Sequence, residues 1–140
     1  ANTMSGYSMV VASCISEHAM EHAMSAYHPK LAHGAGLIML SKEYFTFWIN
    51  KHVCDDRFID MAKLLGKKDA DKPEDFIEAL LKLQKDCGVD NLKMSDYGIK
   101  KEDAMTLAKN ARATTQRLFN CDPAPTTDED IAGIYERAFK

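Results

Sequence analysis

Four of the five histidines lie within residues 16–34, "SEHAMEHAMSAYHPKLAHG". His18 and His22 are four residues apart, so on a helix they point the same way, with Cβ atoms about 5–6 Å apart. Pro29 ends such a helix, and the short loop after it returns the chain to His33. Neutral imidazole nitrogens bind divalent metals at about 2.0–2.1 Å. The spacing therefore predicts part of a metal site.

The site is incomplete by its pattern alone. Gly34 and Gly36 would let the backbone come close to the histidines, and a helix that begins near Gly34 would offer N–H groups to an anion such as a phosphate or an alkoxide. Two histidines four residues apart on a helix, with no other ligand, are however more often solvated or packed in the core than bound to a metal. Only two or three protein ligands lie close by in the sequence, so further ligands would have to come from elsewhere.

Two glutamates and two further histidines surround these residues. Glu17 and Glu21 are also four apart, but are shifted by one position from the histidines. We expect them to cap the helix, pair with surface cations or steady the imidazole N–H groups. His28, beside Pro29, is expected on the surface, and His52 is interpreted as a histidine at a helix C-terminus.

Helical periodicity runs through nearly the whole chain. Residues 37–53 are apolar on most of the helix circumference, which predicts a helix surrounded by others at the centre of a bundle. Residues 71–88 carry an apolar stripe, with Pro73 near the first turn and Gly88 at the end. Residues 100–119 repeat that pattern with four positions, Ala104, Leu107, Ala108 and Ala111.

The last predicted helix, over 126–139, opens with Thr126 and Glu129 at capping-box spacing and continues with an apolar stripe, Ile131, Ile134 and Ala138. No segment alternates with the period of a strand, and no hairpin signal occurs. The chain is expected to be one all-α domain over residues 1–140, a bundle of roughly six or seven helices by typical helix and loop lengths.

The composition narrows the class of protein. Hydrophobic residues at 46% and charged residues at 28% fit a soluble globular domain, and the length of 140 residues allows one real core. A net charge of −3 gives no electrostatic case for binding nucleic acid or membranes. The four cysteines are widely scattered, which favours free thiols in a reducing cytoplasm. The chain also begins in an apolar, helix-compatible segment without an initiator methionine, so we expect an interior start within a larger protein.

The histidine-rich stretch resembles the signature of the iron-containing (metal-dependent) alcohol dehydrogenases. That family has His-x3-His, a stretch of small and aromatic residues, and then His-Gly opening a hydrophobic helix, as in "SEHAMEHAMSAYHPKLAHGAGLIML". "ANTMSG" resembles the helix before the signature. "MSDYGIKKEDAMTLAKNA" and "CDPAPTTDEDIAGIYERAF" resemble the closing segments, so the resemblance covers nearly the whole chain. One departure is Ala32, where the family commonly has proline, and the loop from His22 to His33 is one residue longer than in some members.

The resemblance implies a fold and a set of roles. The chain would be the C-terminal helical domain of a dehydroquinate synthase-like, two-domain enzyme, and the N-terminal dinucleotide-binding domain would be absent from it. His18 and His33 would be metal ligands, completed by an Asp and a His from upstream. His22 would lie in the catalytic cleft near the nicotinamide and the substrate.

The implied activity is that of a metal-dependent NAD(P) alcohol dehydrogenase that interconverts a small alcohol and an aldehyde or ketone. Iron or zinc and NAD or NADP would be its cofactors, and the isolated fragment would be inactive. A homodimer is one arrangement that the sequence leaves open. Two alternatives remain: another enzyme of this fold, such as a glycerol dehydrogenase or a dehydroquinate synthase-like enzyme, or a non-catalytic helical module whose histidines merely pack.

Overall fold

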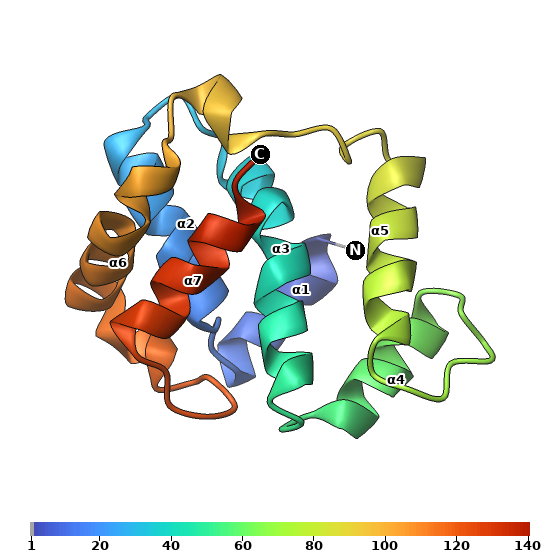
Figure 1. The fold of residues 1–140 in the computed structure, drawn as a ribbon. Coiled ribbons are helices and arrows are strands. Elements are labelled where there is room, and N and C mark those ends of the chain that lie inside the picture. Colours follow the sequence, from blue (N-terminus) through green and yellow to red (C-terminus); the bar gives the residue numbers. More distant parts are fainter. Residues whose placement is uncertain (1) are drawn as a thin grey trace.

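Helices alone make up the regular structure of residues 2–140, the part of the chain that the computed structural model describes (Figure 1). No strand occurs in this range, and the all-α prediction is confirmed. The seven α-helices and two short 3₁₀ helices are, in chain order, α1 (Asn2–Val11), α2 (Ser16–Tyr27), α3 (His33–Asn50), α4 (Asp55–Leu64), α5 (Asp75–Asp86), η1 (Met94–Tyr97), η2 (Lys101–Asp103), α6 (Ala104–Phe119) and α7 (Asp128–Ala138).

Helix α3 lies at the centre of the bundle, as its apolar sequence predicts. It packs against α2, α5 and α7, while α6 packs against α2 and α7, and α4 against α5 (Figure 1). Because α3 has neighbours on several sides, it buries side chains around much of its circumference: Met39, Leu40, Tyr44, Trp48 and Ile49. This helix therefore fixes the positions of the helices around it.

The apolar stripes of the C-terminal helices are buried as expected, but the cap of α7 differs by one residue. Thr127 and Asp130 form the capping box: the Asp130 N–H donates to Thr127 Oγ1 at 3.1 Å, and the Thr127 N–H donates to Asp130 Oδ2 at 3.0 Å. The predicted pair, Thr126 and Glu129, is wrong. Thr126 is instead used by Arg112, whose Nη2 donates to the Thr126 carbonyl oxygen at 3.0 Å.

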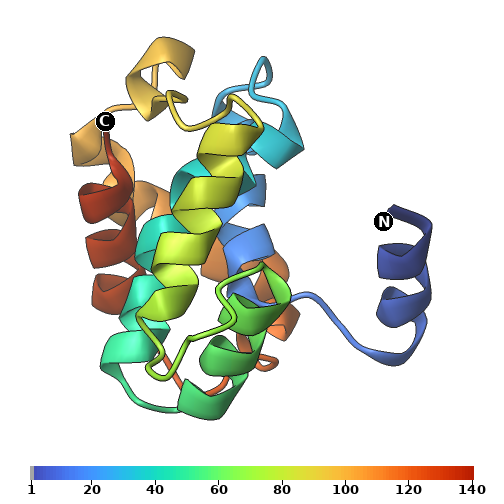
Figure 2. The same cartoon turned by 90° about the vertical axis from the view of Figure 1, so that its right-hand side faces the viewer.

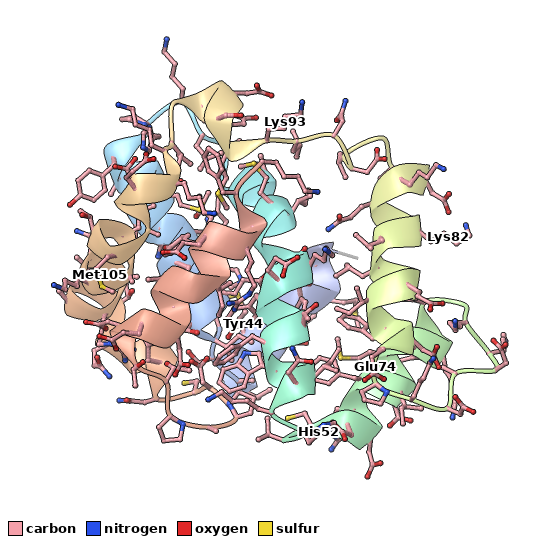
Figure 3. All side chains as sticks on the ribbon, in the orientation of Figure 1. Tyr44, His52, Glu74, Lys82, Lys93 and Met105 are labelled. Atoms are coloured by element: carbon pink, nitrogen blue, oxygen red, sulfur yellow. The ribbon has the colours of Figure 1, made fainter. Side chains whose placement is uncertain are left out.

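Helix α2 is held by hydrogen bonds at its start and near its middle. The Ser16 N–H donates to Asp122 Oδ1 at 2.9 Å, and the Tyr44 hydroxyl donates to the same oxygen at 3.1 Å. The hydroxyls of Ser16 and Tyr44 lie 3.0 Å apart. Tyr44 projects from α3, as Figure 3 shows. Further along, the Tyr135 hydroxyl of α7 donates to the Met20 carbonyl oxygen at 2.7 Å. These bonds fix the helix that carries His18 and His22.

Helix α1 stands apart from the other helices. In Figure 2 it is joined to α2 by an extended linker and lies away from the bundle. Its large apolar side chains are exposed, with accessible fractions between 61% and 87%: Met4, Tyr7, Met9, Val10 and Val11. None of the helices in residues 2–140 is both long enough and apolar enough to cross a membrane. The exposed residues are thus an uncovered apolar surface on a short helix.

The hydrogen-bonded triad of Ser16, Tyr44 and Asp122 yields a first prediction. Asp122→Ala would leave the Ser16 N–H and the Tyr44 hydroxyl without their acceptor, at a cost of about 2–3 kcal/mol in the free energy of unfolding. Asp122→Asn keeps an acceptor oxygen and should cost clearly less. Urea unfolding followed by circular dichroism measures both, and equal losses in the two variants would contradict this account.

Glu17 yields a second prediction, because it is a carboxyl group buried without a full set of partners. Its side chain is only 8% exposed, its Oε1 accepts no hydrogen bond within the described residues, and burial raises the pKa of Glu17 from 4.5 to about 8. In the unfolded chain the group ionises near pH 4.5, whereas in the folded chain it keeps its proton to about pH 8. The folded state therefore binds more protons between these values, and stability falls as the pH rises.

The expected slope from this group is about 1.4 kcal/mol per pH unit between pH 5 and pH 8. Glu17→Gln, which stays neutral, should be the more stable form at pH 8, and the difference from the wild type should shrink toward pH 5. Glu136→Gln, at an exposed position of α7, serves as the matched control. A pH-independent difference between the Glu17 variant and the wild type would count against a buried, protonated carboxyl group.

Candidate metal centre

Helices α2 and α3 bring three histidines together. His18 and His22 lie one turn apart on α2, and His33 is the first residue of α3. The centroid of the His33 ring lies 5.2 Å from that of His18 and 5.2 Å from that of His22. The short loop between the helices, residues 28–32, makes this approach feasible. The expectation that the rings of His18 and His33 converge is confirmed.

The two predicted ligands face each other through nitrogen atoms. His18 Nδ1 lies 3.2 Å from His33 Nε2. Two nitrogens at this separation, each about 2.0–2.1 Å from one metal ion, subtend an angle of about 100°, close to that of a tetrahedral site. The pair therefore fits a divalent metal in both donor type and separation, and leaves further coordination positions open.

Glu21 sets the orientation of the His33 ring. Its carboxylate Oε2 is the hydrogen-bond and ion-pair partner of His33 Nδ1, and its Oε1 accepts from the Ser25 hydroxyl. Because a carboxylate oxygen accepts, Nδ1 of His33 is the nitrogen that carries the proton. This assignment leaves the lone pair on Nε2, the atom that faces His18. Of the roles considered for Glu21, steadying an imidazole N–H group matches the contact, and pairing with a surface cation does not.

Distance alone allows a second grouping of ligands. Glu21, His22 and His33 each offer one ligand atom within 4.8 Å of the others. In this grouping Glu21 would replace His18. Both oxygens of Glu21 are, however, already engaged by His33 and Ser25, whereas within residues 2–140 the facing nitrogens of His18 and His33 have only each other. The bonding pattern favours His18 and His33 as the metal-binding pair, with His22 beside them.

The electrostatic environment of His18 keeps its ring neutral. Burial lowers the pKa of His18 below its ordinary value of 6.5, the neighbouring His33 and His22 rings lower it further, and Glu21 opposes them. Metal ligands must be unprotonated imidazoles, so a lowered pKa favours the ligating form near neutral pH. His18 is partly buried, whereas His22 and His33 are exposed, which leaves the site open on one side.

The two glycines in the first turn of α3 have different surroundings. A Cβ atom on Gly36 would lie 2.6 Å from Glu21 Cγ, so this position is closed to any side chain while Glu21 stays in place. A Cβ atom on Gly34 would meet nothing within 4 Å. The expected close approach is thus found at Gly36 alone. Leu31, which is 5% exposed, anchors the loop between α2 and α3 in the core.

The other two histidines lie outside the site. His52 follows the end of α3 opposite to His33, has a positive φ of 53°, and places Nδ1 3.0 Å from Asp55 Oδ2 (Figure 3). It is a helix C-terminal histidine, as interpreted. His28 is partly buried rather than on the surface, because its ring packs near Gly98, with Nδ1 3.8 Å from where a Cβ atom on Gly98 would lie.

Burial of the two glutamates is the feature that sequence reasoning missed. Glu17, Met20, Glu21 and Met24 follow steps of three, one and three, which is the spacing of a core-facing helix stripe. All four are buried in the structure. The methionines already marked this face of α2 as the core, so the periodicity could have placed both glutamates inside it.

Comparison with known proteins assigns the chain to a family. A model of the C-terminal region of the Fe-containing alcohol dehydrogenase family matches residues 1–139. The long-chain primary alcohol dehydrogenase AdhA of Thermoanaerobacter ethanolicus is 30% identical over 131 residues, covering 87% of this chain and 31% of that protein. The mitochondrial hydroxyacid-oxoacid transhydrogenase of Pongo abelii is 26% identical over 118 residues, covering 81% of this chain and 24% of that protein.

Solved structures agree on the fold. The alcohol dehydrogenase ADH/D1 from an archaeal halo-thermophile of a Red Sea brine pool superposes with a TM-score of 0.76 at 22% identity, covering 88% of this chain and 32% of that one. A 1,3-propanediol oxidoreductase superposes with a TM-score of 0.75 at 24% identity, covering 89% and 32%. The chain thus spans between about a quarter and a third of the length of these relatives. The chain belongs to the Fe-containing alcohol dehydrogenase family and corresponds to its C-terminal, all-helical region.

Proposed function

We propose that this chain is the metal-binding domain of an NAD(P)-dependent alcohol dehydrogenase, and that it is inactive without the rest of the enzyme. The observation that carries the proposal is the pair of facing nitrogens, His18 Nδ1 and His33 Nε2, 3.2 Å apart. The family assignment supports it, since the relatives of the chain include alcohol dehydrogenases.

The residues of this chain would bind the metal and transfer protons near it. His18 and His33 would be two of its ligands, with the remaining ligands supplied from upstream of this domain. Iron or zinc bound here would supply Lewis-acid polarisation of an alcohol or carbonyl oxygen. Imidazole binds both iron and zinc, so the histidine ligands do not indicate which of the two metals is bound.

His22 is proposed as the group that faces the substrate and cofactor. It is exposed, lies one turn from His18 on α2, and has its ring 5.2 Å from that of His33. Imidazole side chains are common proton donors and acceptors in catalysis. We assign to His22 the relay of the alcohol proton, or the positioning of the alcohol and the nicotinamide.

The partner of this domain is proposed to be an N-terminal dinucleotide-binding domain. Two uncovered apolar surfaces support such a partner. One is the exposed face of α1, and the other is an apolar cavity of about 350 Å³ between α3 and α5, lined by residues that include Leu37, Phe45 and Leu80. The four free thiols favour the cytoplasm as the location of the enzyme.

Two other functions fit the same fold less well. A glycerol dehydrogenase or a dehydroquinate synthase-like enzyme would share the domain plan, and its substrate would be set by the cleft between the domains. A non-catalytic module would need no matched pair of ligand nitrogens. The arrangement of His18 and His33 therefore favours a metal enzyme over such a module, and the alcohol dehydrogenases among the relatives favour that activity over the other enzymes.

The metal assignment predicts the effect of removing either ligand. Because loss of a residue that only supports a ligand costs about 10–100-fold in metal affinity, His18→Ala or His33→Ala should cost more than about 100-fold. Both variants of the full-length enzyme should lose bound iron or zinc, measured by mass spectrometry, and alcohol-dependent reduction of NAD or NADP.

His52→Asn is the matched control, since asparagine tolerates the positive φ at this position and His52 lies outside the site. It should keep both metal and activity. Retention of metal and activity by both ligand variants would overturn the proposal. Activity that persists in the His22→Ala variant with an unchanged pH profile would remove His22 from the proton relay.

A further inference from the structure

We propose that Glu21 is a positioning residue that holds His33 in the tautomer with its proton on Nδ1, so that Nε2 is presented to His18. The inference rests on the proposed metal role of His18 and His33 and deepens it. Under this proposal the site includes a buried side chain inside the bundle, in addition to the exposed His22 and His33.

The carboxylate of Glu21 is buried, and both of its oxygens have hydrogen-bond partners. Its side chain is fully buried, yet it belongs to α2 next to the exposed His22. Both of its oxygens are used, Oε2 by His33 Nδ1 and Oε1 by the Ser25 hydroxyl. Ser25 lies one turn further along α2, so the carboxylate is held from both sides.

The consequence for His33 follows from the chemistry of imidazole. A neutral ring carries its proton on one nitrogen and its lone pair on the other. A carboxylate that accepts from Nδ1 therefore leaves Nε2 as the only ligand atom of His33. Nε2 is the atom 3.2 Å from His18 Nδ1. The contact with Glu21 thus selects both the atom that would bind a metal and its direction.

Gly36 makes the necessary room on the facing helix. It is buried in the first turn of α3, three residues after His33. A Cβ atom there would lie 2.6 Å from Cγ and 2.9 Å from Oε1 of Glu21. Glycine inside a helix costs about 1 kcal/mol relative to alanine, so its presence calls for a local reason. The close approach of the Glu21 carboxylate supplies that reason.

The tautomer of His33 can be observed directly and without any metal. Long-range proton–nitrogen correlation spectra of the ¹⁵N-histidine-labelled chain distinguish a protonated Nδ1 from a protonated Nε2. We expect the Nδ1–H form for His33 in the wild type. Glu21→Gln keeps a carbonyl acceptor of the same length and should keep that form, whereas Glu21→Leu should convert His33 to a mixture of tautomers.

Metal affinity is the second measurement. Titration of the full-length enzyme with Co²⁺, followed by its visible absorption bands, should show an affinity about 10–100-fold weaker for Glu21→Leu than for the wild type, and a smaller change for Glu21→Gln. Gly36→Ala should displace the carboxylate and give the same change of tautomer as Glu21→Leu. If circular dichroism shows that Glu21→Leu does not fold, Gly36→Ala still tests whether the Glu21 carboxylate selects the tautomer of His33.

The two measurements separate this inference from the proposed function. A wild-type His33 with its proton on Nε2, or an unchanged tautomer in both Glu21→Leu and Gly36→Ala, would overturn the role of Glu21 even if Co²⁺ binds. Full-length wild-type enzyme that binds no metal, with the tautomer still dependent on Glu21, would overturn the metal role of the site and leave the positioning role supported.

Discussion

The close packing of α2 against α3 is the constraint on which the site depends. At this contact a buried carboxylate on one helix fills the space that a side chain at Gly36 would occupy on the other. The same two helices carry all three clustered histidines. A small shift between them would move His33 relative to His18, so the separation of the two rings is determined by core packing rather than by the exposed loop.

The rest of the bundle keeps these two helices in register. Asp122, from the segment between α6 and α7, accepts hydrogen bonds from the start of α2 and from Tyr44 on α3. Tyr135 on α7 donates to the middle of α2. Residues from distant parts of the sequence therefore meet at α2, which explains why a site made from residues 18–33 needs a domain of more than a hundred residues to support it.

Much of the fold could be predicted because helical periodicity is a local property. The central position of α3 followed from its apolar circumference, and the stripe of Ala104, Leu107, Ala108 and Ala111 is buried as its spacing indicated. The N-cap of α7 was predicted one residue too early. Thr126 and Thr127 are both suitable N-cap residues, and Arg112 from another helix binds Thr126. Such a choice between neighbours is made by tertiary contacts.

The candidate site was predictable in part for the same reason. The spacing of His18 and His22 and the turn at Pro29 indicated that the rings would converge. The pairing of Glu21 with His33 could not be read from spacing, because it depends on how closely two helices approach and on the absence of a side chain at Gly36. The interior position of Glu21 was available from the methionines beside it, but its partner was not.

The isolation of α1 has a consequence for how this part of the chain acquires its structure. A helix of ten residues is only marginally stable in water when no tertiary contact supports it, and every described side chain of α1 is exposed. Burial of its methionines and valines against another surface would therefore stabilise this helix. The bundle of α2 to α7 packs without α1, so the ordering of α1 would be coupled to such a contact while the fold around the histidines would not.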